Sequence, residues 1–302
     1  MRQIDIGSAL EKTTSDLLKA EDAAINFIPK NKTLPSIENL KEIIELLRTI
    51  IFPGYFGKNN TNSAMVAYST VGNLEKLYEM LSQQIHNGLW FDFHALDDNI
   101  REKSERLTLK FIESLPRIRR LLFTDAKAMY DADPAAKNIA EIIFCYPTIR
   151  AMMNHRIAHE LLKLNIPLLP RIISELAHSE TGIDIHPGAV IGENFCIDHG
   201  TGVVIGETAI IGNNVRLYQG VTLGAKKFSL DESGNPIKNE PRHPIIEDNV
   251  VIYSNANILG RITIGKNSTI GGNVWITTDI PPNSKITQAK VIQEHFYFGS
   301  GI

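Results

Sequence analysis

A six-residue period runs through the second half of the chain. Steps of six residues from Ile185, and again from Ile246, reach an apolar side chain every time, at Ile191, Ile197, Val203, Ala209, Val215, Val221, Ile252, Ile258, Ile264, Ile270 and Ile276. An α-helix has a period of 3.6 residues and a β-strand a period of two, so neither produces this pattern. A six-residue repeat is typical of the parallel β-helix. Three such segments form one triangular coil, and the coils stack at a strand spacing of ~4.8 Å.

The corners of such coils give a second, independent pattern. We divide the region into six-residue segments that begin at 185, 191 and 197, then at 205, 211 and 217, and then at every sixth residue from 246 to 270. The fourth residue is Gly or Asn in nine of these eleven segments, and the exceptions are Thr208 and Arg261. Gly and Asn tolerate the positive φ of a tight corner, so both patterns predict the same architecture.

The first half of the chain has the period of α-helices. Apolar side chains recur at helical spacing in residues 36–50, and Ser36 is placed to cap the first turn. Further helices are predicted over about 63–87 and from about residue 97, with a bend at Pro116. Another is predicted over residues 147–164, since Pro147 suits the first turn of a helix and Pro167 ends it.

These patterns predict an α+β chain with two domains and a tail. The helical domain covers residues 1–180, the parallel β-helix covers 181–280, and the tail covers 281–302. The β-helix is interrupted at residues 225–243, a nineteen-residue excursion. Long excursions from a regular scaffold are usually functional loops.

Composition and charge narrow the class of protein. Hydrophobic residues make up 43% and charged residues 22%, which is typical of a soluble globular protein. The net charge of −3 favours neither nucleic acid nor an anionic membrane as a partner. No apolar run approaches the ~20 residues of a membrane helix. The only cysteines are Cys145 and Cys196, so we expect no disulfide framework and predict a cytoplasmic protein.

Ionisable side chains occur in or beside the repeats in three pairs: Asp184 and His186, Asp198 and His199, and Arg242 and His243. His199 is the third residue of its segment, so we expect it at a corner with its side chain outward. A neutral imidazole is a suitable base for a hydroxyl at pH 7, and a carboxylate is needed to fix its tautomer. Asp184 precedes it by fifteen residues, and this spacing does not decide whether the two meet within one chain or across a subunit boundary.

The motifs that contain these residues resemble those of a known family. DIHPGA, DHGTGVVIGET, VTLGA, RHP and GGNVW follow a helical half that carries DPAA and HRIAHELL, and together they resemble serine O-acetyltransferase over about residues 125–280. The resemblance implies a left-handed coil. It also implies that acetyl passes from acetyl-CoA to the hydroxyl of L-serine, a step of cysteine biosynthesis, by direct attack and without a metal.

The same resemblance implies roles for single residues. His199 of DHGTG is expected to be the general base, and Asp184 of DIHP is expected to orient it. Asp133 of DADPAA and Asp198 are expected to bind the serine ammonium group. Arg242 and His243 of RHP complete the expected site, because a zwitterion needs cationic groups for its carboxylate and Arg binds carboxylates through two parallel hydrogen bonds.

Acetyl-CoA is implied to lie in a groove between neighbouring copies, against small residues that leave the backbone accessible: Gly224, Ala225, Ser254 and Gly272. Lys226, Lys227 and Lys266 are candidates for its phosphates. Such a groove forms when three β-helices pack together, so a homotrimer is expected, with pairing of trimers into a hexamer through the helical half. The C-terminal Ile302 matches the ending through which many members of the family bind cysteine synthase.

Three other functions fit parts of the pattern. The repeats alone fit an acyltransferase for another hydroxyl acceptor, such as a sugar. A zinc lyase would need three histidine ligands near one corner, for which His186, His199 and His243 are the candidates. The third alternative is a scaffold without catalysis.

His155 and His159, one helical turn apart, are expected to pack inside the helical domain, and Cys196 is expected to be a buried structural thiol.

Overall fold

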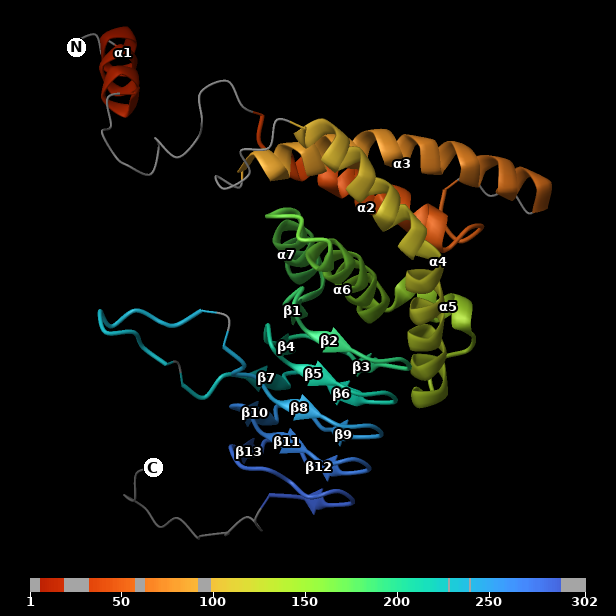
Figure 1. Ribbon diagram of the computed structural model, residues 1–302. Helices are drawn as coiled ribbons and strands as arrows, with labels where there is room; N and C mark the ends of the chain where they lie inside the picture. Colours follow the sequence, from red (N-terminus) through yellow and green to blue (C-terminus); the bar gives the residue numbers. More distant parts are fainter. Residues whose placement is uncertain are drawn as a thin grey trace, which may run out of the picture.

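The computed structural model describes residues 6–18, 33–57, 63–91, 99–227, 229–238 and 240–288. Seven helices lie in the described part of the N-terminal half: α1 (Ile6–Leu18), α2 (Ile37–Ile51), α3 (Ser63–Phe91), α4 (Ile100–Ala132), α5 (Ile139–Cys145), α6 (Pro147–Lys163) and α7 (Leu169–Thr181). The predicted helical half is therefore confirmed. In Figure 1, α2, α3, α6 and α7 lie at one end of a stack of β-coils, with α6 and α7 nearest the first coil.

Helices α2 and α4 illustrate how the sequence specifies this half. Ser36 caps α2 by accepting a hydrogen bond from the Asn39 N–H at 3.2 Å, and its apolar stripe is fully buried. Helix α4 contains Pro116 and continues past it to Ala132. Its two halves point in different directions in Figure 1, which agrees with the bend predicted at proline. The far end of α4 thereby reaches the side of the β-coils.

The C-terminal half is a three-sided parallel β-helix. Its strands are β1 (Asp184–Ile185), β2 (Val190–Ile191), β3 (Cys196–Asp198), β4 (Val204–Ile205), β5 (Ile210–Ile211), β6 (Arg216–Tyr218), β7 (Thr222–Gly224), β8 (Ile245–Ile246), β9 (Val251–Ile252), β10 (Asn257–Leu259), β11 (Thr263–Ile264), β12 (Thr269–Ile270), β13 (Trp275–Ile276) and β14 (Lys285–Ile286). They form the sheets β1-β4-β7-β10-β13, β2-β5-β8-β11 and β3-β6-β9-β12-β14. The last strand lies beyond residue 280, at which the sequence analysis ended this domain.

The first turn of the β-helix is two residues longer than the regular later turns, those that do not contain the excursion. Ile185 pairs with Ile205 and Ile197 pairs with Leu217, a step of twenty residues, whereas Ile252 pairs with Ile270, a step of eighteen. The two additional residues lie between Ile197 and Ile205, in the sequence DHGTGVV. They widen the corner between β3 and β4, which is the corner that carries His199.

The three corners are not built alike. At the corner between the second and third sheets, five asparagines with φ of 55° to 61° form a ladder in which each side-chain amide donates to the next at 3.0 Å: Asn194, Asn214, Asn249, Asn267 and Asn283. The corner between the third and first sheets is also left-handed. At the corner between the first and second sheets, Gly188, Thr208 and Arg261 are not left-handed, so both exceptions to the Gly or Asn pattern fall there.

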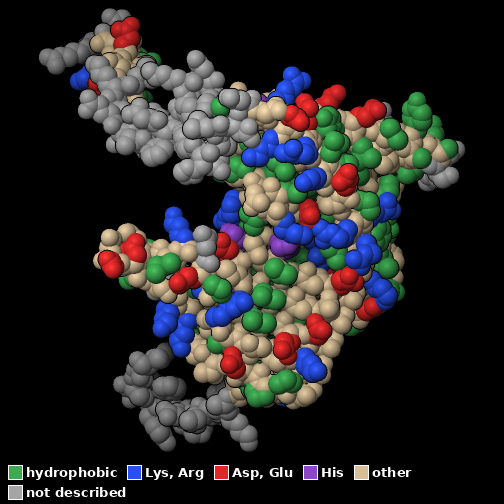
Figure 2. Space-filling view, viewed as in Figure 1, with side chains coloured by type: hydrophobic (Ala, Val, Ile, Leu, Met, Phe, Trp, Pro, Cys, Tyr) green, Lys and Arg blue, Asp and Glu red, His purple; other side chains and the backbone are tan. Residues whose placement is uncertain are grey.

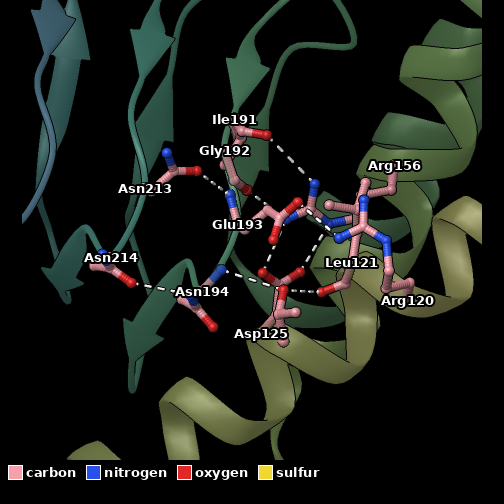
Figure 3. A network of polar contacts seen from close by, with 11 residues as sticks. Arg120, Leu121, Asp125, Arg156, Ile191, Gly192, Glu193, Asn194, Asn213 and Asn214 are labelled. Atoms are coloured by element: carbon pink, nitrogen blue, oxygen red, sulfur yellow. Dashed lines mark hydrogen bonds and ion pairs between the residues drawn. The ribbon is translucent and has the colours of Figure 1, made fainter.

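A buried ion pair joins the helices to the first coil (Figure 3). Arg156 of α6 donates two hydrogen bonds to Asp125 of α4, at 2.7 and 2.9 Å, and a third to the Gly192 carbonyl at 2.9 Å. Asp125 also accepts from the Phe195 N–H at 3.1 Å. Close by, the Thr148 hydroxyl donates to the Ile197 carbonyl at 2.6 Å. These contacts fix strand β3, and therefore Asp198 at its end and His199 directly after it, against α4 and α6.

No helix within the described ranges is both long enough and apolar enough to pass through a membrane.

Candidate functional site

Asp198 ends β3, and His199 follows it at the widened corner. The backbone of His199 is left-handed, with φ of 58°, and its side chain is 75% exposed, as the position in the repeat predicted. Its Nε2 atom lies 3.9 Å from Oδ1 of Asp198. The strain of a left-handed histidine costs on the order of 1 kcal/mol, so the surrounding structure must hold it. The imidazole is thus free to meet a ligand.

Asp133 lies at the same corner, because α4 ends at the preceding residue. The Tyr146 hydroxyl donates to its Oδ2 atom at 2.5 Å, and the Ala135 N–H donates to Oδ1 at 2.8 Å. The hydrogen bond from Tyr146 lowers the pKa of Asp133 and raises the pKa of Tyr146 to about 12, and the charge of His199 further lowers that of Asp133. The carboxylate of Asp133 is therefore ionised and positioned beside His199.

Sequence reasoning missed Tyr146. This residue ends α5 and precedes α6, and its backbone is extended there. The only local signal is the Tyr-Pro step at the start of a helix, which says nothing about a partner thirteen residues earlier. We call Asp133, Tyr146, Asp198 and His199 the acidic corner.

Arg242 and His243 lie at a different corner, where the excursion returns to β8. Arg242 donates to Oε2 of Glu207 at 2.5 Å. Nδ1 of His243 accepts from the Thr208 N–H at 3.0 Å, which leaves Nε2 to carry the ring proton. Burial, followed by the charge of Arg242, lowers the pKa of His243 to about 4, so this ring is neutral at pH 7.

The position of His243 depends on a glycine one coil above it. A Cβ at Gly206 would lie 2.0 Å from Cδ2 of the His243 ring, so no larger residue fits at this position without displacing the ring. Arg261 donates to the His243 carbonyl at 2.9 Å from the opposite side. His186 lies close enough for its charge to act on His243, and burial lowers the pKa of His186 as well. We call Glu207, Arg242, His243 and His186 the basic corner.

Within one chain, Asp184 belongs to neither the acidic corner nor the basic corner. It lies on β1, where its carboxylate, the Glu175 carboxylate and the His178 ring place one atom each within 4.8 Å of one another. Among the described residues, no hydrogen bond or ion pair joins Asp184 to His199. The question left open by the spacing is thus answered for one chain: the two side chains do not pair.

The acidic and basic corners flank the first sheet from its two sides. The chain between them, from Val203 to Thr208, spans about five residues, or ~16 Å at ~3.3 Å per residue. An amino acid is shorter than this backbone separation, so contact of one such molecule with both corners of one chain is disfavoured. Within one chain His199 therefore lies apart from His186 and His243, so a single chain does not bring the three candidate zinc ligands together.

The residues expected to line the coenzyme groove also divide between two corners. Ser254 and Gly272 stack on successive coils, and a Cβ at Gly272 would lie 3.0 Å from the Ser254 carbonyl oxygen. They lie below His199 on the same edge of the β-helix. Gly224 ends β7 on the other side of the first sheet, where its carbonyl accepts from the Gly260 N–H at 3.0 Å, and Ala225 follows it.

Basic side chains gather beside Gly224, at the base of the excursion. A cavity of about 240 Å³ lies there, lined in part by Lys226, Lys227, Arg242 and Arg261. Figure 2 shows Lys and Arg side chains on both sides of the excursion. Lys266 lies elsewhere, at the corner between the second and third sheets, where its N–H donates to Glu247. Of the three lysines considered for the phosphates, only Lys226 and Lys227 line this cavity.

The structure agrees with a packing role for His155, His159 and Cys196. His155 is buried, and burial keeps its pKa well below the usual value, while Nδ1 of His159 lies 2.8 Å from the Pro187 carbonyl. Cys196 is buried against the helices, and burial raises the pKa of its thiol to about 12. A thiol that stays protonated is a poor nucleophile.

A parallel β-helix of six-residue repeats with an exposed histidine at a widened corner agrees with a class of transferases built from such repeats. Residues 243–278 match the family described as bacterial transferase hexapeptide (six repeats). The chain is 48% identical to the plasmid serine acetyltransferase of Synechococcus elongatus, over 98% of this chain and 94% of that protein. It is 45% identical to the serine acetyltransferase of Bacillus subtilis, over 55% of this chain and 73% of that one.

Solved structures give the same result. Serine acetyltransferase isoform 3 of Entamoeba histolytica, in complex with cysteine, superposes with a TM-score of 0.71 at 34% identity, covering 96% of each chain. The soybean serine acetyltransferase, complexed with serine, superposes with a TM-score of 0.52 at 29% identity, covering 83% of this chain and 96% of that one. The chain belongs to the serine acetyltransferase family.

Proposed function

We propose that this protein transfers acetyl from acetyl-CoA to the hydroxyl of L-serine, giving O-acetyl-L-serine and CoA, in cysteine biosynthesis. The observation that carries the proposal is the division of the site into an acidic corner with an exposed imidazole and a basic corner with a guanidinium group. Serine is a zwitterion with a hydroxyl group, so it needs an anionic site, a cationic site and a base.

The acidic corner binds the amino group and activates the hydroxyl. Asp133 and Asp198 accept hydrogen bonds from the serine ammonium group. His199 takes the proton of the serine hydroxyl as that oxygen attacks the thioester carbonyl carbon. A C–O bond forms, the C–S bond of the tetrahedral intermediate breaks, and the imidazolium returns the proton to the leaving CoA thiolate. No covalent enzyme intermediate is required.

The basic corner binds the carboxylate. Arg242 donates to the two carboxylate oxygens, and Glu207 holds the guanidinium group in place through the 2.5 Å ion pair. His243 is neutral, with its proton on the ring nitrogen that faces away from Thr208, so it donates a further hydrogen bond. Because the two corners of one chain are ~16 Å apart, the basic corner that serves a given His199 comes from a neighbouring copy.

A homotrimer provides this arrangement three times. Exposed apolar side chains on the β2–β5–β8 sheet support the presence of a subunit contact there, with Val190 49% and Ile210 39% exposed. Figure 2 shows hydrophobic side chains together on this part of the surface. In such a trimer, Asp184 of one copy can approach His199 of the next and fix its tautomer. Pairing of two trimers into a hexamer through the helical half remains a proposal.

Acetyl-CoA lies in the groove between two copies. Ser254 and Gly272 present backbone groups below His199, and Gly224 and Ala225 of the neighbouring copy face them. The basic cavity with Lys226 and Lys227 is suited to the phosphates of the nucleotide end. Binding of cysteine synthase through Ile302 stays a prediction, since that residue lies outside the described ranges. The cytoplasmic location also stays a prediction.

A thiol-release assay with acetyl-CoA and a panel of acceptors tests the proposed function. The panel contains L-serine, L-threonine, L-homoserine and several sugars, and mass spectrometry identifies the product. We expect release of CoA with serine at a kcat/KM at least 100-fold above that with any sugar, because a sugar leaves Asp133 and Arg242 without charged partners. Preferred acetylation of a sugar, or no acceptor-dependent release, would refute the proposal.

A further inference from the structure

Four residues form a column down the corner between the third and first sheets. Asp198 pairs with Tyr218, Leu217 with Ile252, and Ile252 with Ile270. The residues two positions beyond the inward side chain of each strand therefore stack on successive coils, at a rise of ~4.8 Å. From the first coil downward they are His199, Gln219, Ser254 and Gly272.

Gln219 is the member of this column to which the proposed mechanism gives no role. Its backbone is fixed on both sides, because its carbonyl accepts from the Asn255 N–H at 3.0 Å and the adjacent Gly220 N–H donates to the Thr201 carbonyl at 3.0 Å. The side-chain oxygen is buried, yet it has no hydrogen-bond partner among the described residues. A buried polar atom without a partner is destabilising and is rare in a folded protein.

The place of this amide matches one part of the acyl donor. The thioester carbon must lie next to the hydroxyl that His199 deprotonates, and the pantetheine arm then continues down the column towards Ser254 and Gly272. Gln219 stands one coil below His199, between the base and these two residues. A carboxamide carries both a donor and an acceptor, so it can pair with a carbonyl or an amide N–H at this level.

We propose that the carboxamide of Gln219 hydrogen-bonds the thioester end of the acyl donor. This inference rests on the proposed function, since it requires acetyl-CoA in the groove below His199. The contact supplies the partner that the buried amide lacks in the free chain. Where the amide nitrogen donates to the thioester oxygen, the bond strengthens as negative charge develops on that oxygen during attack.

The test compares the full-length wild type with two substitutions at this position. Gln219→Met keeps the length of the side chain and removes both hydrogen-bonding atoms, and Gln219→Glu keeps the shape and an acceptor but removes the donors. Gln288→Met is the matched control, since Gln288 is exposed and, among the described residues, its side chain donates to the Asn273 carbonyl alone. Measurements are kcat and KM for acetyl-CoA, affinity for L-serine by calorimetry, thermal midpoint and oligomer mass.

We expect Gln219→Met to lower kcat/KM for acetyl-CoA on the order of 10- to 100-fold, with serine affinity, thermal midpoint and oligomer mass unchanged. Gln219→Glu should lower kcat/KM to a similar degree if the essential hydrogen bond is donated by the amide nitrogen. The loss should be smaller if the essential bond is accepted by the amide oxygen. Values of kcat/KM within about twofold of the wild type in both variants would overturn the proposal, as would a loss explained by a smaller oligomer. Failure of the wild type itself to acetylate serine would instead refute the proposed function.

Discussion

The hydroxyl of Tyr146 donates a 2.5 Å hydrogen bond to Asp133, and this contact places the Asp133 carboxylate at the corner that carries His199. The two residues come from different parts of the helical half, since Asp133 follows α4 and Tyr146 joins α5 to α6. Their bond makes the end of a helix part of a site on the β-helix. In the proposed mechanism, the helical half therefore contributes directly to serine binding.

Substitution of Tyr146 by Phe should weaken serine binding. Without the hydroxyl, the Asp133 side chain loses its strongest partner and becomes free to rotate, so we expect the KM for serine to rise roughly 10-fold, equivalent to ~1.4 kcal/mol. The KM for acetyl-CoA should change by less than about twofold. Steady-state kinetics with each substrate varied in turn measures both constants.

Tyr130→Phe is the control, because Tyr130 is exposed near the end of α4, the helix that Asp133 follows. Equal effects of the two substitutions on the KM for serine would show that the bond from Tyr146 to Asp133 has no part in binding.

Breaking the buried ion pair between Asp125 and Arg156 should lower the free energy of unfolding far more than breaking the exposed ion pair beside it. Both side chains are at least 95% buried, with exposed fractions of 0% and 5%. Arg156→Met leaves an uncompensated buried carboxylate and should lower the free energy of unfolding by about 3–5 kcal/mol. Chemical denaturation followed by circular dichroism measures the change.

Arg120→Gln provides the comparison for this pair. Arg120 pairs with Glu193 at 2.7 Å on the surface, beside the buried pair in Figure 3. An exposed pair contributes ~0–1 kcal/mol, so this variant should unfold nearly as the wild type does. A loss below about 1 kcal/mol for Arg156→Met would mean that the buried pair does not hold the two halves together.

Much of this fold follows from the sequence, for a physical reason. The inward positions of a β-helix repeat every six residues, so a list of apolar residues gives the coils, and Gly or Asn at the fourth position gives two of the three corners. Thr208 and Arg261 broke that pattern because their corner is not left-handed. The repeat could not show this, since those residues are held by contacts with the excursion, such as the bond from the Arg242 N–H to the Thr208 hydroxyl at 2.9 Å.

The site was predicted less completely than the fold. The motifs identified His199, Asp198 and Asp133 together, and the structure places all three at one corner. Tyr146 had no signal in the sequence, because its role depends on the angle between two helices. The partner of Asp184 also could not be predicted, since spacing along one chain does not describe contacts between copies.

The stability of the protein should depend on His243 between pH 6.5 and about pH 4. Burial lowers the pKa of His243 from its usual 6.5 to about 4. As the pH falls through this window the unfolded state binds a proton and the folded state does not, so the free energy of unfolding decreases. The groups that face the ring are Arg242, Glu207, His186 and Arg261.

His243→Gln removes this contribution. Between pH 7 and pH 4 the wild type should lose about 1–2 kcal/mol more stability than the variant does, less than the full pKa shift allows because part of the ring environment remains hydrated. Urea denaturation at several pH values measures both curves. Parallel curves for the two proteins would show that the ring of His243 is not kept neutral by the fold.

Mixed oligomers should reveal the origin of the two corners. His199→Ala inactivates the acidic corner and Arg242→Ala inactivates the basic corner, so each variant alone should be nearly inactive. If every site joins the acidic corner of one copy to the basic corner of the next, co-expression in equal amounts leaves about a quarter of the sites with both corners intact. Activity of the mixed oligomers near that fraction is expected, measured by thiol release.

Each variant mixed with wild-type chains, at the same ratio, calibrates this assay. No recovery of activity in the doubly mutant mixture, although mass spectrometry shows mixed oligomers, would place both corners of each site on a single chain.

The most direct measurement is the kcat of His199→Asn for acetyl transfer to L-serine, compared with that of the wild type at pH 7.5. Loss of the general base should lower kcat by about 10²- to 10⁴-fold, while the KM for acetyl-CoA and the thermal midpoint change little, because the side chain is exposed and makes few contacts. A kcat within about threefold of the wild type would contradict the assignment of His199 as the base, and with it this account of catalysis.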